Sequence, residues 1–167
     1  MNTWIGPDQL SLKLQTPLSR GHQRGKPVHY LYDGYGESGS GGILSDADDM
    51  LKYAESYMNP NQVQDQNLSK ALNLSLTVQA TDFADLTAPD AIAYAWFVQG
   101  LDMGKDRWYQ HGGTTAGFNS MLQFQPSSNT AFVVLSSCGY YWDKVSEIAD
   151  ALSSKFFNSF HIPPEDK

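Results

Sequence analysis

The chain has 167 residues, and its 11 basic against 18 acidic side chains give a formal net charge of −7. This length suits one domain, and a composition with 41% hydrophobic and 13% aromatic residues can form a packed core, which excludes wholesale disorder. The acidic balance argues against a nucleic-acid-binding protein, and the longest apolar run, residues 91–98, is too short to span a membrane.

The cysteine count and the first residues bound the chemistry further. Cys138 is the single cysteine, so an internal disulfide and a cysteine-based zinc site are excluded, and neither a metal nor a cofactor is expected. The first eight residues have no basic start and no apolar stretch, so no secretory signal is visible. The cellular compartment stays open on this evidence.

The first half of the chain predicts a loop-rich segment followed by helices. Glycine and proline punctuate residues 1–42, where only 28–32 has a strand-like pattern. Residues 43–80 are expected to be helical. Ser45 is the predicted N-cap, Asp48 takes the capping-box position, and Asn59-Pro60 ends the first helix. A second helix is predicted over 65–79.

The second half predicts an antiparallel sheet closed by a helix. Four β-rich runs alternate with turn residues, and such short connections favour an antiparallel meander. The runs are 91–99, 107–111, 118–125 and 130–137. An amphipathic helix follows, ended by Pro163-Pro164, with an apolar stripe of Val145, Ile148, Ala149, Leu152, Phe156 and Phe160. The predicted class is α+β, with three or four antiparallel strands, the C-terminal helix and two further helices.

One segment, residues 111–118, carries a pattern typical of a catalytic site. A strand rich in aromatic residues delivers His111 at its end, and Gly112 and Gly113 follow. Glycines there let a substrate carbonyl approach the backbone and leave N–H groups pointing outward, as an oxyanion hole requires. The alternative is a glycine-rich β-turn with an incidental histidine.

This segment resembles the third catalytic motif of the serine β-lactamase and penicillin-binding superfamily. It is most similar to the branch of class C β-lactamases, DD-peptidases and esterases, with His111-Gly112-Gly113 as the triplet. Residues 114–118 resemble the turn that follows it, with Ala116 where proline is usual. The resemblance extends in order along nearly the whole chain, through residues 21–36, 41–50, 94–97 and 131–136.

The resemblance implies a β-lactamase/transpeptidase-like fold and β-lactam, D-Ala peptide or ester substrates. His111 would help to bind the substrate carboxylate or orient the acid/base group, and the Thr114 backbone N–H would be an oxyanion donor. Gly112, Gly113 and Thr115 would bind substrate. The family's nucleophile lies in Ser-x-x-Lys, which occurs nowhere in these 167 residues.

Two further motif matches are interpreted as coincidences. Tyr57-Met58-Asn59 and Ser127-Ser128-Asn129 fit the family's Tyr-x-Asn and Ser-x-Asn patterns by letter, but they fall at a helix end and in a hairpin turn. By resemblance, residues 1–167 are therefore a single partial domain, the C-terminal portion of a hydrolase that begins just past the tyrosine motif. Its sheet and C-terminal helix are expected over 91–160.

The chain alone is therefore predicted to be inactive, as either a truncated piece or a natural short protein. The alternative functions are a non-catalytic binding or assembly module that reuses half of the fold, and a remnant reading frame without activity.

The pattern of the last predicted strand also indicates that another strand pairs with its free edge. Residues 131–135 are apolar at every position, which indicates a strand buried on both faces in the middle of a sheet. As the final strand of the meander, however, it keeps one unpaired edge, which an N-terminal strand occupies in the resembled family. Residues 28–32 could fold back onto it, an N-terminal fragment could bind, or two chains could pair. We favour a homodimer through 130–137, because symmetric dimers are the commonest oligomers.

Overall fold

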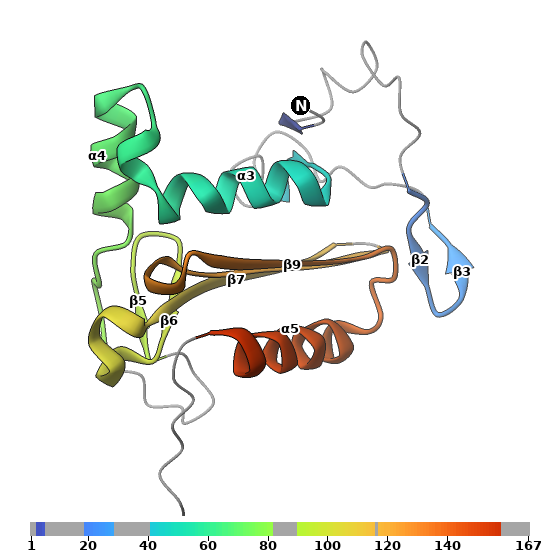
Figure 1. Cartoon of the computed structure of the whole chain (residues 1–167). Helices are drawn as coiled ribbons and strands as arrows, with labels where there is room; N and C mark the ends of the chain where they lie inside the picture. Colours follow the sequence, from blue (N-terminus) through green and yellow to red (C-terminus); the bar gives the residue numbers. More distant parts are fainter. Residues whose placement is uncertain (1–2, 6–18, 29–40, 82–89, 116, 158–167) are drawn as a thin grey trace, which may run out of the picture.

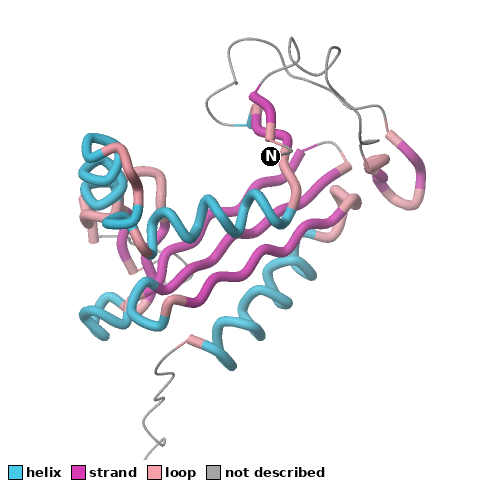
Figure 2. Tube along the Cα trace, turned by 45° about the horizontal axis from the view of Figure 1, so that its top comes forward, coloured by secondary structure: helices cyan, strands magenta, loops and turns pink. Residues whose placement is uncertain are grey.

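A computed structural model describes residues 3–5, 19–28, 41–81, 90–115 and 117–157 (Figure 1). Its class is α+β, as predicted. Helix α3 covers one face of a five-stranded sheet and helix α5 covers the other (Figure 2). The principal helices are α3 (Ala47–Met58), α4 (Gln66–Ser75) and α5 (Trp142–Phe156).

The sheet is an antiparallel meander in sequence order, which confirms the predicted topology. Its strands are β5 (Ala91–Ile92), β6 (Phe97–Gln99), β7 (Trp108–Thr115), β8 (Phe118–Gln125) and β9 (Thr130–Ser136). The short 3₁₀ segments η3 (Leu101–Asp106) and η4 (Pro126–Ser128) join β6 to β7 and β8 to β9. The three long strands β7, β8 and β9 therefore form the platform on which α3 and α5 pack.

Two strand boundaries differ from the prediction. The expected strand 91–99 is two strands, because Ala95 adopts a left-handed φ of 61° and the chain reverses, with Ala93 N–H donating to the Trp96 carbonyl at 2.9 Å. The expected strand 107–111 continues to Thr115, because residues 111–115 all pair with β8. The predicted turn over 112–117 is correspondingly shorter.

The helix ends also differ from the prediction. Asp46, not Ser45, is the N-cap of α3, since its side chain accepts from the Asp49 backbone N–H at 2.9 Å. The Ser45 hydroxyl instead contacts the Thr3 hydroxyl at 2.8 Å. Helix α4 begins after its cap, Asp65, and ends at Ser75, four residues before the predicted end.

Aromatic residues fill the space between α3 and the sheet. The rings of Tyr57, Trp96 and Phe124 form mutual contacts with centroids 4.8–5.5 Å apart, and Tyr109 stacks on Phe124 at 5.5 Å. Buried aromatic pairs of this kind each add about 0.5–1.5 kcal/mol beyond the burial of their area. The structure therefore anchors β7 and β8, which carry the predicted motif, to a rigid core.

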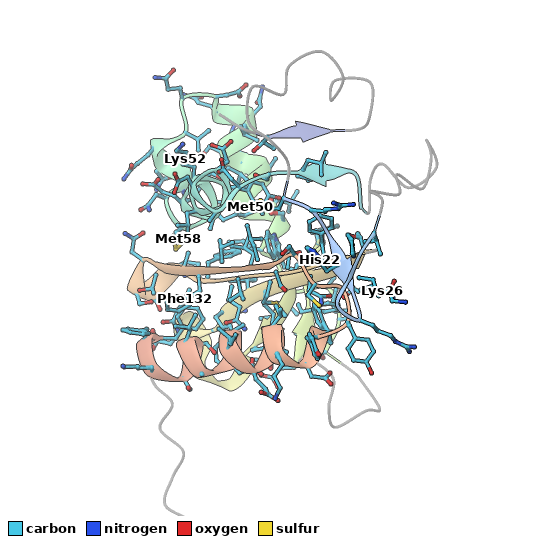
Figure 3. All side chains as sticks on the ribbon, turned by 90° about the vertical axis from the view of Figure 1, so that its right-hand side faces the viewer. His22, Lys26, Met50, Lys52, Met58 and Phe132 are labelled. Atoms are coloured by element: carbon cyan, nitrogen blue, oxygen red, sulfur yellow. The ribbon has the colours of Figure 1, made fainter. Side chains whose placement is uncertain are left out.

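A second, smaller cluster lies between α5 and the sheet, where Met121 meets Val145 and Ala149. The predicted stripe of α5 is only partly buried, because Ile148 and Phe156 are each about half exposed. Phe132 lies on the α5 side of β9, within 5.7 Å of the Phe156 ring (Figure 3). Phe160 and Pro163-Pro164 lie outside the described residues.

Strand β9 lies at the edge of the sheet rather than in its middle. Its residues are all apolar between Thr130 and Ser136 because α3 and α5 contact it from the two faces. Most of its side chains are only half-buried, and Leu135 is 48% exposed. Among the described residues no strand pairs with the outer edge of β9, so the expected unpaired edge is present there.

Residues nearer the N-terminus add two short antiparallel strand pairs. Strand β1 (Trp4–Ile5) pairs with β4 (Ile43–Leu44), and β2 (His22–Gln23) pairs with β3 (Lys26–Pro27). The β2–β3 hairpin lies at the end of the main sheet (Figure 1), where His22 N–H donates to the Ser137 carbonyl at 2.8 Å. Of the strand predicted over 28–32, only Val28 lies within the described residues. In the described part of the chain, no helix has the length and apolarity of a membrane span.

Candidate functional site

The predicted motif occupies the second half of β7. Strand β6 pairs with residues 108–110 only, so among the described residues nothing pairs with that edge of β7 over 111–115. The opposite edge of the same segment pairs with β8 throughout. In antiparallel strands every second residue directs its N–H and C=O to the same side, so residues 111–115 present free backbone donors and acceptors along an open edge. We call residues 111–115 the β7 open edge.

The glycines of the motif lie within the strand, not at its end as the sequence predicted. A Cβ built on Gly112 would lie 2.4 Å from the six-membered ring of Trp142 and 2.9 Å from the Ser120 carbonyl oxygen. A Cβ on Gly113 would meet only the Ser120 hydroxyl, at 3.5 Å. Gly112 is therefore required by packing against Trp142. Gly113 lies on the opposite face of the strand and leaves that opposite face open.

The side chain of His111 is exposed and held by one aromatic neighbour. Its ring stacks on Phe97 of β6 with centroids 5.4 Å apart and planes 12° apart. Because side chains alternate along a strand, His111, Gly113 and Thr115 share one face, and Gly112 and Thr114 share the other. The imidazole therefore stands beside the β7 open edge, in contact with solvent, in an orientation that Phe97 restricts.

Thr114 belongs to a hydrogen-bonded chain that fixes the end of β7. Its hydroxyl donates to Asn119 Oδ1 at 2.7 Å, and Asn119 Nδ2 donates to the Cys138 carbonyl at 2.7 Å. Asn119 is 2% exposed, and the oxygen and the nitrogen of its side-chain amide are both hydrogen-bonded in this buried position. This chain ties the backbone at Thr114 to the loop after β9.

The β2–β3 hairpin holds the turn between β7 and β8 from outside. His22 N–H donates to the Gly117 carbonyl at 3.2 Å, and Gly139 N–H donates to the His22 carbonyl at 2.9 Å. Gly117 has a φ of +88°, and a Cβ there would lie 2.4 Å from a methyl group of Val28, so only glycine suits this close approach. Ala116, between Thr115 and Gly117, lies outside the described residues.

Sequence reasoning missed three of these contributors: Trp142, Asn119 and the hairpin around His22. Asn119 could have been noticed as a polar residue beside the motif in a β-rich run, because a buried amide in a strand needs partners. Trp142 is 30 residues from Gly112 and His22 is 95 residues from Gly117 in the sequence, and nothing in their local patterns indicates these contacts.

The two coincidental motifs have structural roles. The Tyr57 hydroxyl forms a hydrogen bond with that of Tyr53 at 2.9 Å while the Tyr57 ring packs in the core, and Asn59 Nδ2 donates to Asn129 Oδ1 at 2.7 Å beside η4.

A hollow of about 550 Å³ lies away from the β7 open edge. Tyr109 and Arg107 help to line it, and none of residues 111–115 does. The described residues contain no group of three or more potential metal ligands.

A comparison with protein families gives one result. A family model described as Beta-lactamase matches residues 1–153. The match spans the whole sheet, the β7 open edge and all but the last turn of α5.

Proposed function

Because the chain belongs to the β-lactamase family, we propose that it is the C-terminal, substrate-binding portion of a β-lactamase-like serine hydrolase. Proteins of this family bind β-lactam or peptide substrates; the β-lactam, D-Ala peptide or ester preference of this chain is part of the proposal. The observation that carries the proposal is the β7 open edge, where the motif His111-Gly112-Gly113 lies on a strand that pairs with β8 along one edge and leaves the other edge unpaired, next to a buried core.

Each motif residue has a role in this proposal. The backbone N–H of Thr114 would donate to the oxyanion that forms when the scissile carbonyl is attacked. The absence of a side chain at Gly113 would let the substrate lie against the strand, and Thr115 would continue the contact. His111 would hold the substrate carboxylate or orient the acid/base group, from a position fixed by Phe97.

One oxyanion donor alone does not make a catalyst. Removal of a single donor from an intact site typically costs about 10²–10³ in rate, so a lone donor contributes a few kcal/mol at most. The attacking serine, its lysine and the other oxyanion donor belong to Ser-x-x-Lys, which this sequence lacks. We therefore infer that the chain does not hydrolyse its substrate by itself.

The test is hydrolysis of nitrocefin and of p-nitrophenyl acetate by the purified chain. We expect no turnover above buffer. Turnover that follows the protein through purification and disappears in His111→Ala, but not in the matched variant His22→Ala, would overturn the proposal of an inactive half-site, that is, a substrate-binding site without its nucleophile.

The proposed partner is a second copy of the chain, paired through the outer edge of β9. No charged residue lies between Thr130 and Ser137, so the edge lacks the charges with which proteins usually prevent pairing. Phe156 of α5, whose ring contacts Phe132 of β9, and Leu135 of β9 add exposed apolar surface beside it. Antiparallel pairing about Val133 would bring these surfaces together symmetrically.

Light scattering at micromolar concentration tests this pairing. We expect a dimer that Leu135→Lys converts to a monomer, while Leu74→Lys, a similarly exposed position on α4, leaves the dimer intact. A monomeric parent protein would instead favour an N-terminal fragment as the partner. A partner isolated on this edge without hydrolysis in the complex would support the alternative function, a non-catalytic assembly module.

A further inference from the structure

The β2–β3 hairpin concentrates positive charge on an acidic chain. Arg20, Arg24 and Lys26 fall within seven residues and are all exposed, and residues 19–28 contain no acidic residue. The chain as a whole carries a net charge of −7. The hairpin is therefore a basic island that an anionic group approaching this end of the sheet would meet first.

Exposed aromatic rings lie next to this basic island. Tyr140, Tyr141 and Trp142 are 53%, 54% and 36% exposed, and they follow one another immediately before and at the start of α5. The Tyr140 and Tyr141 rings meet edge to face at 5.2 Å, and the Arg24 guanidinium lies 5.3 Å from the Tyr140 centroid. This contact joins the rings and the hairpin into one surface, which we call the aromatic–cationic surface (Arg24, Lys26, Tyr140, Tyr141 and Trp142).

The aromatic–cationic surface is continuous with the β7 open edge. The Trp142 ring lies against Gly112, and Gly139 packs against the Thr115 carbonyl oxygen, the position a Cβ would occupy being 2.9 Å from it. His22 and Lys26 stand on the hairpin beside the end of the sheet (Figure 3). A peptide that lay along residues 111–115 would thus lie beside Trp142, with one end directed toward the hairpin, which contacts the next turn at Gly117.

We propose that the aromatic–cationic surface selects an acidic peptide whose backbone pairs with the β7 open edge. This inference rests on the proposed function and extends it by naming the substrate class. Backbone pairing supplies affinity without regard to sequence, and flanking side-chain contacts supply specificity. Trp142 and Tyr141 would contact an apolar side chain of the peptide, and Arg24 and Lys26 would pair with its carboxylates.

The charges around the surface favour a short peptide and define its direction. Asp143 follows Trp142 in the first turn of α5 and would repel a carboxylate there, so the acidic end of the peptide belongs over the hairpin. A nucleic acid would also offer anions and stacking bases, but a polyanion would be repelled by the net charge of −7 beyond the three cations of residues 20–26.

The experiment measures fluorescence anisotropy with two short fluorescein-labelled peptides, one ending in two glutamates and the other in two glutamines. We expect the parent chain to bind the acidic peptide about fivefold more tightly at low salt, since each exposed ion pair contributes little. Arg24→Gln with Lys26→Gln should abolish this preference. Lys70→Gln with Lys155→Gln, which changes the net charge equally elsewhere, should keep it.

The aromatic contribution needs its own pair of variants. Trp142→Ala should weaken binding of both peptides, whereas Tyr94→Ala, an exposed aromatic residue on the β5–β6 turn, should not. Equal affinity for the two peptides, binding of neither, or tighter binding of a labelled oligothymidylate would overturn the inference. None of these outcomes bears on the inactive half-site itself, which the hydrolysis assay judges separately.

Discussion

Gly112→Ala tests whether the Trp142 contact holds the motif in place. The new methyl group would lie 2.4 Å from the indole ring and 2.9 Å from the Ser120 carbonyl oxygen. Trp142 is partly exposed and can move, but the Ser120 oxygen belongs to the paired β8 backbone and cannot move without disturbing the ladder. The substitution must therefore displace the ring and also strain the strand.

The expected cost can be set against a neighbouring glycine. Overpacking of a well-packed site costs about 1–3 kcal/mol, so Gly112→Ala should lower the free energy of unfolding by an amount in this range. Gly113→Ala places its methyl 3.5 Å from the Ser120 hydroxyl, an ordinary contact. Since glycine within a strand is itself unfavourable by about 0.5–1 kcal/mol, Gly113→Ala should be neutral or slightly stabilising.

Urea denaturation of the two variants and the parent measures the free energies of unfolding and decides between these values. In a thermal scan, a cost of 1 kcal/mol should lower the melting temperature by about 2–4 °C in a chain of this size. Combining Gly112→Ala with Trp142→Ala should recover part of the loss, because the ring that the methyl displaces is gone. If Gly112→Ala is as stable as Gly113→Ala, the reasoning that packing demands glycine at this position is wrong.

Two further predictions concern α3. Asp46→Ala removes the N-cap carboxylate and should cost about 1 kcal/mol, whereas Asp48→Ala, exposed in the same first turn, should cost less than half of that; thermal unfolding of both variants checks the difference. Desolvation, and then the hydrogen bond to Tyr57, raise the pKa of Tyr53, so stability from its neutral form should be complete below about pH 10 and fall as the pH rises further. Urea unfolding across this range should show a shallower decline for Tyr53→Phe than for the parent, and an equally steep decline would contradict the prediction.

The sequence predicted the meander and its helices because their signals are local. Turn residues separate β8 from β9, and the apolar spacing of α3 and α5 is helical. The signals failed where tertiary contacts decide. Nothing at Ala95 indicates its left-handed conformation, and Asp46 and Ser45 are equally good caps until Thr3 engages the Ser45 hydroxyl.

The sequence predicted which residues form the candidate site, but not how these residues are arranged in space. The glycines of the motif suggested the end of a strand, yet pairing with β8 continues to Thr115. What makes the edge open is that β6 ends its pairing at Gln110, a fact of register that no local pattern reports. The support from Trp142 and Asn119 depends on residues brought together only by the folded chain.

The sheet presents two unpaired edges among the described residues, and their chemistry suits them to different partners. The outer edge of β9 is apolar and uncharged, and half-exposed Phe156 packs on Phe132 of the same strand, so covering this edge removes hydrophobic surface from water as well as pairing a backbone. The β7 open edge consists of His, Gly and Thr, whose small or polar side chains gain little from burial. Its backbone groups are therefore better suited to a transiently bound ligand, whereas the outer edge of β9 is better suited to a stably bound partner. Leu135→Lys should accordingly change the association state without altering peptide binding, and Trp142→Ala should do the reverse.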